Sequence, residues 1–414
     1  MKKKLYLSTE RFPYKNGEKT FLQSELNALA QEYDITIISH AESELTVSEI
    51  WETDLPVGIN VVNCSIRLNA AKVILYFLRY IFDADGWKEI IDIYKQHNNF
   101  FFMLYQSLGF YIRAMENWRL LSKKKLFDKK EDFIFYSFWY TYYTYSMTKN
   151  KRKYKNVKII TRAHGFDLYD ERYQCGRQPF KKIMDTKLDK IFFACEYAKD
   201  YYIKKMYSLD TERYVVSKIG TQPALTNTDM RSKEGNVIVS CSRVVGLKRI
   251  HLIIDALSLW DKNEIVWHHF GGGEEYDAME QYASRKLSKN MKVRYYFHGD
   301  IENEDILRFY ASNHIVCFVT TSSTEGGAPV SVQEAMAYGI PIIGTDVGGI
   351  TEMIQENGIL IRSVPTAEEI RNAIAYIYCN PDVRKKMCKA SLELWKQEYC
   401  AERNVQRFLN FLKE

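Results

Sequence analysis

The segment TTSSTEGGAPVSVQEAMAYGIPIIGTDVGG, residues 320–349, decides the fold. An apolar run precedes it at Ile315–Val319, a helical pattern starts near Val330, and another apolar run spans Pro341–Thr345. Strand, helix and strand in this order are typical of parallel sheets covered by helices. Glycines in the loop let backbone amides approach a ligand, and the helix start favours phosphate. We therefore expect an anion site, with Glu325 and Glu334 beside it for sugar or ribose hydroxyls.

The same alternation of short apolar runs and helical patterns extends over the whole chain. In the first half it predicts helices at Phe21–Glu32 and Trp87–Gln96 and strands at Leu5–Ser8, Ile35–Ser39, Phe133–Ser137, Val157–Thr161 and Lys190–Ala194. In the second half it predicts helices at Ile250–Trp260, Thr366–Cys379 and Asp382–Leu412 and strands at Val237–Ser242, Ile265–Phe270, Val293–Phe297, Ile315–Val319, Pro341–Thr345 and Ile359–Ile361. The fold class is therefore α/β, with two doubly wound parallel sheets in series.

The predicted domains follow from where this alternation stops. Residues 222–235 lack periodicity and gather turn-forming residues, so the first domain spans 1–222 and a linker spans 223–235. The second domain spans 236–390, and residues 391–414 form a C-terminal helix that we expect to pack back on the first domain. Ligands of open parallel sheets bind beyond the carboxyl ends of the strands, so the cleft between the two domains is the expected site.

Composition excludes several classes of protein. The 414 residues include 59 aromatic side chains but only 20 glycines and 8 prolines, which excludes collagen-like and disordered chains. Residues 1–222 carry 36 basic against 27 acidic side chains, whereas residues 223–414 carry 22 against 25. The basic half, with six Lys or Arg in Lys149–Lys158, suits an anionic membrane surface or is simply a solvated face. No nucleic-acid-binding signature accompanies the charge, so nucleic acid is not an expected partner.

The expected location is the cytoplasm, at the inner face of the membrane. The eight cysteines form no C-x-x-C pair and several lie in apolar runs, which fits a reducing compartment. The basic N-terminus lacks the apolar stretch of a signal peptide and is predicted to be the first strand. The longest apolar stretches, Val73–Leu78 and Phe100–Ile112, are shorter than the roughly 20 residues that a membrane-spanning helix needs.

Cationic and imidazole side chains follow two of the predicted strands. Arg243 and Lys248 come just after Val237–Ser242, where two cations suit a diphosphate. His164 follows Val157–Thr161, at a strand end that a parallel sheet exposes. Alone, such a histidine is more often packed or capping, and Asp167 either orients it or caps the next helix.

Together these motifs resemble the retaining, nucleotide-sugar-dependent glycosyltransferases of family four, which have the GT-B fold of two Rossmann-like domains facing across a cleft. The resemblance covers most of the chain and is strongest over 237–361. It implies that Arg243 and Lys248 grip the donor diphosphate, together with backbone groups at Gly17, Gly326 and Gly327.

The resemblance also implies roles for the remaining motifs. Glu334 would hold the ribose hydroxyls, and Gly299 and Ile301 would lie in the loop that reads the nucleobase. His164 and Glu325 would be the catalytic pair, both positioning the transferred sugar. Eight residues separate Glu325 from Glu334 where the family usually has seven, which affects the role of Glu325.

The expected activity is hexosyl transfer from a UDP- or GDP-linked sugar to the hydroxyl of a glycan or lipid-linked acceptor, in polysaccharide or glycolipid assembly. No cofactor and no metal are expected. Asp83-Ala-Asp85 imitates a metal-binding Asp-x-Asp motif but lies away from the strand-end motifs. A nucleotide-sugar epimerase of the same fold and a nucleotide-sugar-binding protein without turnover are the alternatives.

Overall fold

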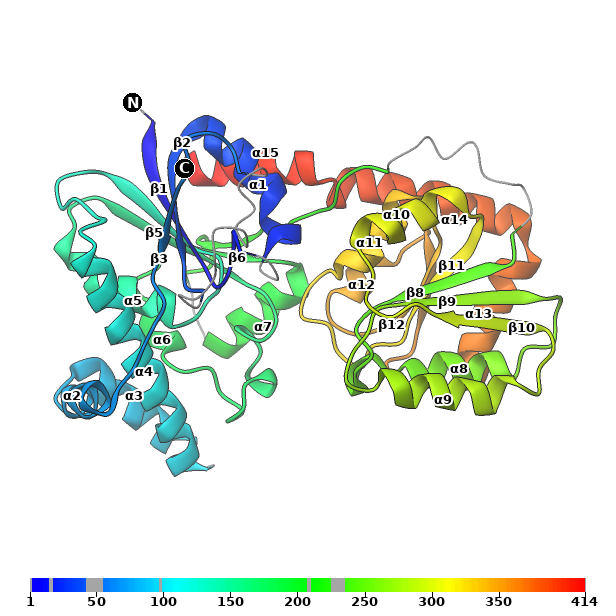
Figure 1. Cartoon of the computed structure of the whole chain (residues 1–414), viewed down its shortest axis with the longest axis horizontal. Coiled ribbons are helices and arrows are strands. Elements are labelled where there is room, and N and C mark those ends of the chain that lie inside the picture. Colours follow the sequence, from blue (N-terminus) through cyan, green and yellow to red (C-terminus); the bar gives the residue numbers. More distant parts are fainter. Residues whose placement is uncertain are drawn as a thin grey trace. The chain divides into compact units, whose positions relative to one another are not determined.

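A computed structural model describes residues 2–14, 18–41, 55–96, 99–206, 210–224 and 235–413, without the side chains of Thr20, Phe21 and Ser24. Gly17 and most of the predicted linker therefore lie outside the described residues. The contacts divide the chain into two units (Figure 1). The first unit is Met1–Ala194, Ala198–Ser217 and Leu409–Glu414, and the second is Cys195–Tyr197 and Lys218–Phe408.

The first unit contains a seven-stranded parallel sheet of order β3-β2-β1-β4-β5-β6-β7. Its strands are β1 (Lys3–Thr9), β2 (Tyr33–Ser39), β3 (Asn60–Asn63), β4 (Phe133–Ser137), β5 (Val157–Ala163), β6 (Lys190–Phe193) and β7 (Tyr214–Val216). The helices in this part of the chain are α1 (Lys19–Glu32), α2 (Ala70–Ile81), α3 (Ala84–Tyr94), α4 (Phe100–Lys123), α5 (Tyr142–Asn150), α6 (Lys181–Asp185) and α7 (Glu196–Met206). The five strands predicted here are confirmed, whereas β3 and β7 lie on short segments that the sequence pattern missed.

The second unit contains a six-stranded parallel sheet of order β10-β9-β8-β11-β12-β13. Its strands are β8 (Val237–Cys241), β9 (Ile265–Phe270), β10 (Val293–Phe297), β11 (Ile315–Thr320), β12 (Ile342–Thr345) and β13 (Gly358–Ile361). The helices are α8 (Ile250–Ser258), α9 (Tyr276–Leu287), α10 (Asn303–Ser312), α11 (Val330–Ala337), α12 (Ile350–Met353), α13 (Ala367–Cys379), α14 (Pro381–Leu394) and α15 (Ala401–Lys413). All six predicted strands are confirmed.

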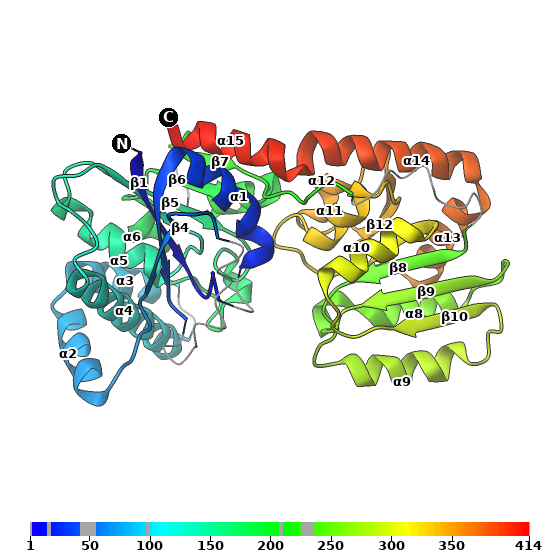
Figure 2. The same ribbon diagram turned by 45° about the horizontal axis from the view of Figure 1, so that its top comes forward.

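Helices cover both faces of the second sheet because successive side chains of a strand point to opposite faces. Ile238 packs in a core with residues of α8, α9 and α13, whereas Val239 packs in a second core with residues of α10 and α11. Figure 2 shows α8 and α9 on one side of the sheet and α10 and α11 on the other. The fold class predicted from the sequence is therefore confirmed: both units have the strand order of a doubly wound, Rossmann-like domain.

The C-terminal segment differs from the single helix predicted at Asp382–Leu412. α14 ends at Leu394, a π-helical turn follows at Trp395–Tyr399, and Cys400 is extended before α15 begins. At this break Thr221 pairs with Cys400 through backbone hydrogen bonds, and Trp395 Nε1 donates to Thr221 Oγ1 at 2.9 Å. A pairing across 179 residues of chain is invisible to helical periodicity.

A buried ion pair lies in the middle of the first unit. The Arg162 guanidinium, on β5, pairs with the Glu25 carboxylate on α1, and both side chains are 2% exposed. Arg162 also donates from Nε to Tyr136 Oη at 2.7 Å and from Nη1 to the Ser217 carbonyl at 2.6 Å. These contacts link α1, β4, β5 and the segment after β7. Loss of the Arg162 cation would also leave the Glu25 carboxylate buried without its charge partner.

We expect Arg162→Met to lower the free energy of unfolding of the first unit by about 3–5 kcal/mol, because Glu25 stays buried without its partner. Replacing both residues, in Glu25→Leu with Arg162→Met, should recover most of that loss, since an apolar pair can replace a buried ion pair. Urea unfolding followed by hydrogen exchange of β4 and β5 measures this. Equal stability of the single and double variants would contradict the assignment.

Candidate functional site

An ionic cluster lies where β8 and β11, which are adjacent in the second sheet, reach their carboxyl ends. The Lys248 ammonium pairs with the Glu325 carboxylate, and these side chains are 19% and 12% exposed. Ser322 Oγ donates to the same Glu325 oxygen at 2.6 Å. Lys248 and Glu325, 77 residues apart in the sequence, are therefore in contact, and the carboxylate neutralises this cation.

Hydrogen bonds fix the two loops that carry this cluster. Thr321 Oγ1 donates to the carbonyls of Lys248 and Arg249, each at 3.0 Å, and Ser323 N donates to the Leu247 carbonyl at 2.8 Å. The Arg249 guanidinium donates to the carbonyls of Thr321 and Ser322 at 2.6 and 2.7 Å. Arg249 therefore fixes the two loops relative to each other. The sequence analysis gave Arg249 no role, because only its neighbour Lys248 belongs to the motif.

The glycine-rich loop after β11 packs directly on the turn after β12. A Cβ atom on Gly348, whose φ is +51°, would lie 1.9 Å from the carbonyl oxygen of Glu325, and one on Gly349 would lie 2.2 Å from that of Gly327. Only glycine fits either position. This close approach fixes the backbone of Glu325, Gly326 and Gly327 just before α11.

Glu334 is buried on α11, where it is 7% exposed. Asn303 Nδ2, at the first residue of α10, donates to Glu334 Oε1 at 2.9 Å. Burial raises the pKa of Glu334 to about 7, although the hydrogen bond from Asn303 acts in the opposite direction. Asn303 was not identified from the sequence, where a single asparagine before a helical pattern carries no signal.

The loop after β10 is tied to the loop after β9. Gly271 N donates to the Gly299 carbonyl at 2.9 Å, and Gly272 N donates to Asp300 Oδ1 at 2.7 Å. Gly299 has a φ of +65°, which favours glycine, and Ile301 is 38% exposed. α10 begins at Asn303 just after this loop, so the loop is connected to Glu334 through the hydrogen bond from Asn303.

Arg243 does not join the Lys248–Glu325 contact. Its side chain is 71% exposed, and its Nη2 lies 3.7 Å from Glu274 Oε1, in an equally exposed pair. Of the two cations in the sequence motif, Lys248 is therefore largely buried against Glu325, whereas Arg243 is exposed.

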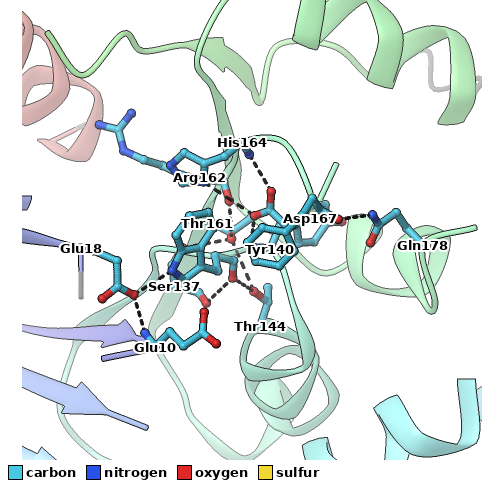
Figure 3. A network of polar contacts seen from close by, with 12 residues as sticks. Glu10, Glu18, Ser137, Tyr140, Thr144, Thr161, Arg162, His164, Asp167 and Gln178 are labelled. Carbon is cyan, nitrogen blue, oxygen red and sulfur yellow. Dashed lines mark hydrogen bonds and ion pairs between the residues drawn. The ribbon is translucent and has the colours of Figure 1, made fainter. Parts of the chain in front are cut away.

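In the first unit, His164 lies at the end of β5 beside aromatic rings (Figure 3). Its ring centroid is 4.5 Å from that of Trp139 and 4.7 Å from that of Phe138. The Asp167 carboxylate accepts from His164 N and Tyr140 N, both at 2.8 Å, and lies 3.7 Å from His164 Nδ1. Asp167 therefore fixes the loops that carry His164 and Trp139. The sequence alone had left the role of Asp167 undecided.

Glu18 organises the loop after β1 and was missed by the sequence analysis. Its buried carboxylate accepts from Glu10 N at 2.6 Å and from Phe12 N at 2.7 Å. It also accepts from Trp139 Nε1 at 2.7 Å, so it connects this loop to the ring beside His164. Gly17, its neighbour in the sequence, lies outside the described residues.

A cavity of about 470 Å³ opens at the same edge of the first sheet. Burial lowers the pKa of His40 to about 3, so that its imidazole is neutral, and burial together with the charge of Glu18 raises the pKa of Glu10. His40 stacks on Tyr143 with ring centroids 3.8 Å apart. The lining combines acceptors, donors and aromatic rings: Glu10, Arg11, His40, Ala41, Ser65, Ile66, Leu68, Arg113, Tyr142 and Tyr143.

The Asp83-Ala-Asp85 motif is part of an ionic network. Asp83 accepts the backbone N–H of Asp85 at the start of α3, and Lys149 Nζ lies 2.8 Å from Asp83 and 3.0 Å from Asp85. Tyr111 Oη also donates to Asp83 at 2.8 Å. These carboxylates therefore have structural partners that join α3, α4 and α5.

Two doubly wound parallel-sheet units, with an ionic cluster and glycine-rich loops at the strand ends of the second, define the GT-B class of glycosyltransferase folds. Comparison with known proteins agrees with this: residues 227–393 match the family model of the glycosyl transferases group 1. The resemblance to glycosyltransferases that was predicted from the sequence is therefore confirmed over these residues.

Curated relatives include an uncharacterised glycosyltransferase of Haemophilus influenzae, 23% identical over 56% of this chain and 63% of the relative. The O-antigen biosynthesis glycosyltransferase WbnH of Escherichia coli is 28% identical over 36% of this chain. These matches span less than two thirds of the relatives' own lengths, 63% and 39%.

Solved structures match the whole fold. The lipopolysaccharide outer core galactosyltransferase WaaB is 15% identical, with a TM-score of 0.69 over 99% of this chain and 100% of its own. Anabaena HepE in complex with UDP is 13% identical, with a TM-score of 0.66 over 99% of each chain.

The raised pKa of Glu334 makes stability depend on pH. The unfolded chain loses this proton in the ordinary glutamate range, so the folded state loses relative stability as pH rises from there to about 7. Glu334→Gln should therefore stabilise the second unit by about 1 kcal/mol or more at pH 8 and by much less at pH 5. Thermal unfolding at both pH values, with the exposed Glu304→Gln as control, measures this. An equal effect at both pH values would contradict it.

Proposed function

We propose that this chain is a retaining, metal-independent glycosyltransferase that moves a hexosyl group from a nucleoside diphosphate sugar to an acceptor hydroxyl. The observation that carries the proposal is the ionic cluster of Lys248, Glu325 and Ser322 between glycine-rich backbone turns at adjacent strand ends. Such fixed positive and backbone groups stabilise a departing diphosphate.

Donor binding exchanges one ion pair for another. The diphosphate takes over the Lys248 ammonium, which pairs with Glu325 in the structure. Glu325 is then released to accept hydrogen bonds from hydroxyls of the donor sugar. Arg243, which is exposed beside Glu274, moves onto the same diphosphate, and the backbone at Gly326 and Gly327 adds further phosphate contacts.

The nucleoside half of the donor is held by Glu334 and the neighbouring loop. Ribose hydroxyls donate to the Glu334 carboxylate, which Asn303 already orients. Backbone groups at Gly299 and Ile301 read the base. The donor is UDP- or GDP-linked, and the UDP complex of HepE supports the first.

The acceptor is a glycan or lipid-linked sugar that enters the cavity lined by Glu10, His40 and Arg113. His164, positioned by Asp167, orients the transferred sugar in this proposal. The departing phosphate oxygen takes the proton of the acceptor hydroxyl on the same face of the sugar, which retains the anomeric configuration. O-antigen biosynthesis by WbnH supports a role in polysaccharide assembly in the cytoplasm.

Incubation with radiolabelled UDP- and GDP-sugars, with and without acceptor extracts, tests this function. A glycosyltransferase gives a labelled product only with acceptor and releases the nucleoside diphosphate. Free sugar or an epimerised sugar without acceptor would identify the epimerase activity instead, and binding without turnover would identify a nucleotide-sugar-binding protein.

Lys248→Met should weaken UDP or GDP binding about ten- to hundredfold, because it removes one charge-assisted contact of roughly 1.5–3 kcal/mol. Arg243→Ala should weaken binding in the same direction. Binding of the free nucleoside should hardly change in either variant. Calorimetry measures the affinities, with Lys262→Met, in the segment between α8 and β9, as the matched control. Unchanged diphosphate affinity in both site variants would refute the assignment.

Sugar transfer should continue in millimolar EDTA, because protein cations and backbone amides neutralise the diphosphate instead of a metal ion. Rates with EDTA, Mg²⁺ and Mn²⁺ measure this directly. Asp83→Asn with Asp85→Asn should leave the response to EDTA unchanged, since those carboxylates bind Lys149. Activity that is lost with EDTA and restored by Mg²⁺ would contradict the proposed role of Lys248.

A further inference from the structure

The short helix α2 exposes apolar side chains on most of its circumference. Tyr76 and Tyr80 are its buried side chains, whereas Val73, Ile74, Leu75, Phe77 and Leu78 are 38–60% exposed. An apolar helix is ordinarily buried in a protein core or in a membrane. The Val73–Leu78 stretch, noted in the sequence and not used by the proposed reaction, is therefore a surface that lacks a cover among the described residues.

Neighbouring helices extend this surface. Tyr76 Oη donates to Glu116 on α4 at 2.8 Å, and Ser107 Oγ of α4 donates to Glu89 on α3 at 3.0 Å. α2 and α3 therefore both contact α4, and Figure 1 shows the three helices grouped at the lower left. The name α2–α4 surface is used here for the large exposed apolar side chains of this region: Val73, Ile74, Leu75, Phe77, Leu78, Phe82, Trp87, Ile91, Tyr94, Phe101, Phe102 and Tyr105.

The charge around the α2–α4 surface is positive. Residues 55–82 contain Arg67, Lys72 and Arg79 but no Asp or Glu, and residues 99–112 contain no charged side chain. The acidic side chains of α3 and α4 are each paired with cations: Asp83 and Asp85 with Lys149, Glu89 and Asp92 with Arg177, and Glu116 with Lys72 and Arg119. A negatively charged, apolar partner complements this surface.

We propose that the α2–α4 surface inserts into the interface of a bilayer that contains anionic phospholipid. Trp and Tyr suit the boundary between acyl chains and headgroups, and exposed cations such as Arg79 and Lys88 suit the lipid phosphates. α2 has 12 residues and a length of roughly 18 Å, so it lies in the interface and does not span the core of about 30 Å. A second copy would bring the same positive charge against this surface.

The basic run Lys149–Lys158, expected from the sequence to meet the membrane, is partly engaged in contacts within the protein. Lys149 is held by Asp83 and Asp85, and Lys151 by Asp189 at 2.7 Å. Lys158 Nζ donates to the Leu412 carbonyl at 3.2 Å. Lys153 Nζ lies 4.7 Å from the centroid of the Trp118 ring. The α2–α4 surface therefore offers more unengaged side chains to a membrane than this run does.

The acceptor cavity adjoins this surface. Leu68, just before α2, and Arg113, on α4, both line the cavity. Membrane insertion would bring the cavity to the headgroup region, so that a lipid-linked acceptor could present its sugar without leaving the bilayer. This consequence rests on the proposed function, whereas the membrane contact itself does not.

Vesicle sedimentation of the full chain, without donor or acceptor, tests the membrane contact. Most of the protein should co-sediment with vesicles of phosphatidylcholine and phosphatidylglycerol. A much smaller fraction should co-sediment with vesicles of phosphatidylcholine alone. High salt should weaken the binding. Ile74→Asp with Leu78→Asp, one helical turn apart, should lower the partition coefficient about tenfold or more.

The matched control is Met291→Asp with Val364→Asp, two exposed apolar side chains of the second unit, which should bind vesicles as the wild type does. Circular dichroism and thermal unfolding confirm that each variant is folded. The proposal is overturned if the wild type stays in the supernatant, if the α2 variant binds equally well, or if the control loses as much. A concentration-dependent dimer that the α2 variant abolishes, without vesicle binding, would assign the surface to a second copy instead.

Discussion

In a sheet whose strands all run parallel, every carboxyl end lies at one edge, and the rest of this structure depends on that constraint. In the second unit, β8 and β11 lie side by side although 73 residues lie between the end of β8 and the start of β11. Their following loops therefore meet, which brings Lys248 to Glu325. The same rule places His164, Glu18 and the cavity lined by Glu10 and His40 at one edge of the first sheet. Helices on both faces of each sheet supply the apolar burial that stabilises this arrangement.

Several charged side chains at these edges are held by other parts of the protein. Glu18 binds backbone amides and Trp139, Asp167 binds two backbone amides, and Lys248 binds Glu325. The first two contacts fix loops, because a buried carboxylate must keep its donors. The Lys248–Glu325 pair is different, since it joins two side chains whose charges are both at the strand ends and does not fix a backbone segment. In the proposed reaction this is the pair that a donor diphosphate would exchange.

Helical and strand periodicity predicted the elements whose burial pattern is regular. Strands such as β8 and β11 are buried on both faces, so they appear as continuous apolar runs. α2 and α4 were noted only as apolar stretches, because their exposed apolar side chains hide the contrast between a buried and a solvent face. The break between α14 and α15 was missed because Cys400 pairs with Thr221, far away in the sequence.

The sequence by itself determined the two doubly wound units and the strand-end motifs that carry the resemblance to glycosyltransferases, since these depend on local periodicity and on residue types at fixed spacing. Only the tertiary structure decided that Lys248 binds Glu325 while Arg243 is exposed, that Asn303 reaches Glu334, and that Asp83 and Asp85 bind Lys149. The tertiary structure also decided that the apolar stretch Val73–Leu78 is largely exposed, whereas the apolar runs of β8 and β11 are buried. The physical reason is that ion pairing, burial and pKa depend on side chains brought together from distant segments, and local sequence carries no information about that distance.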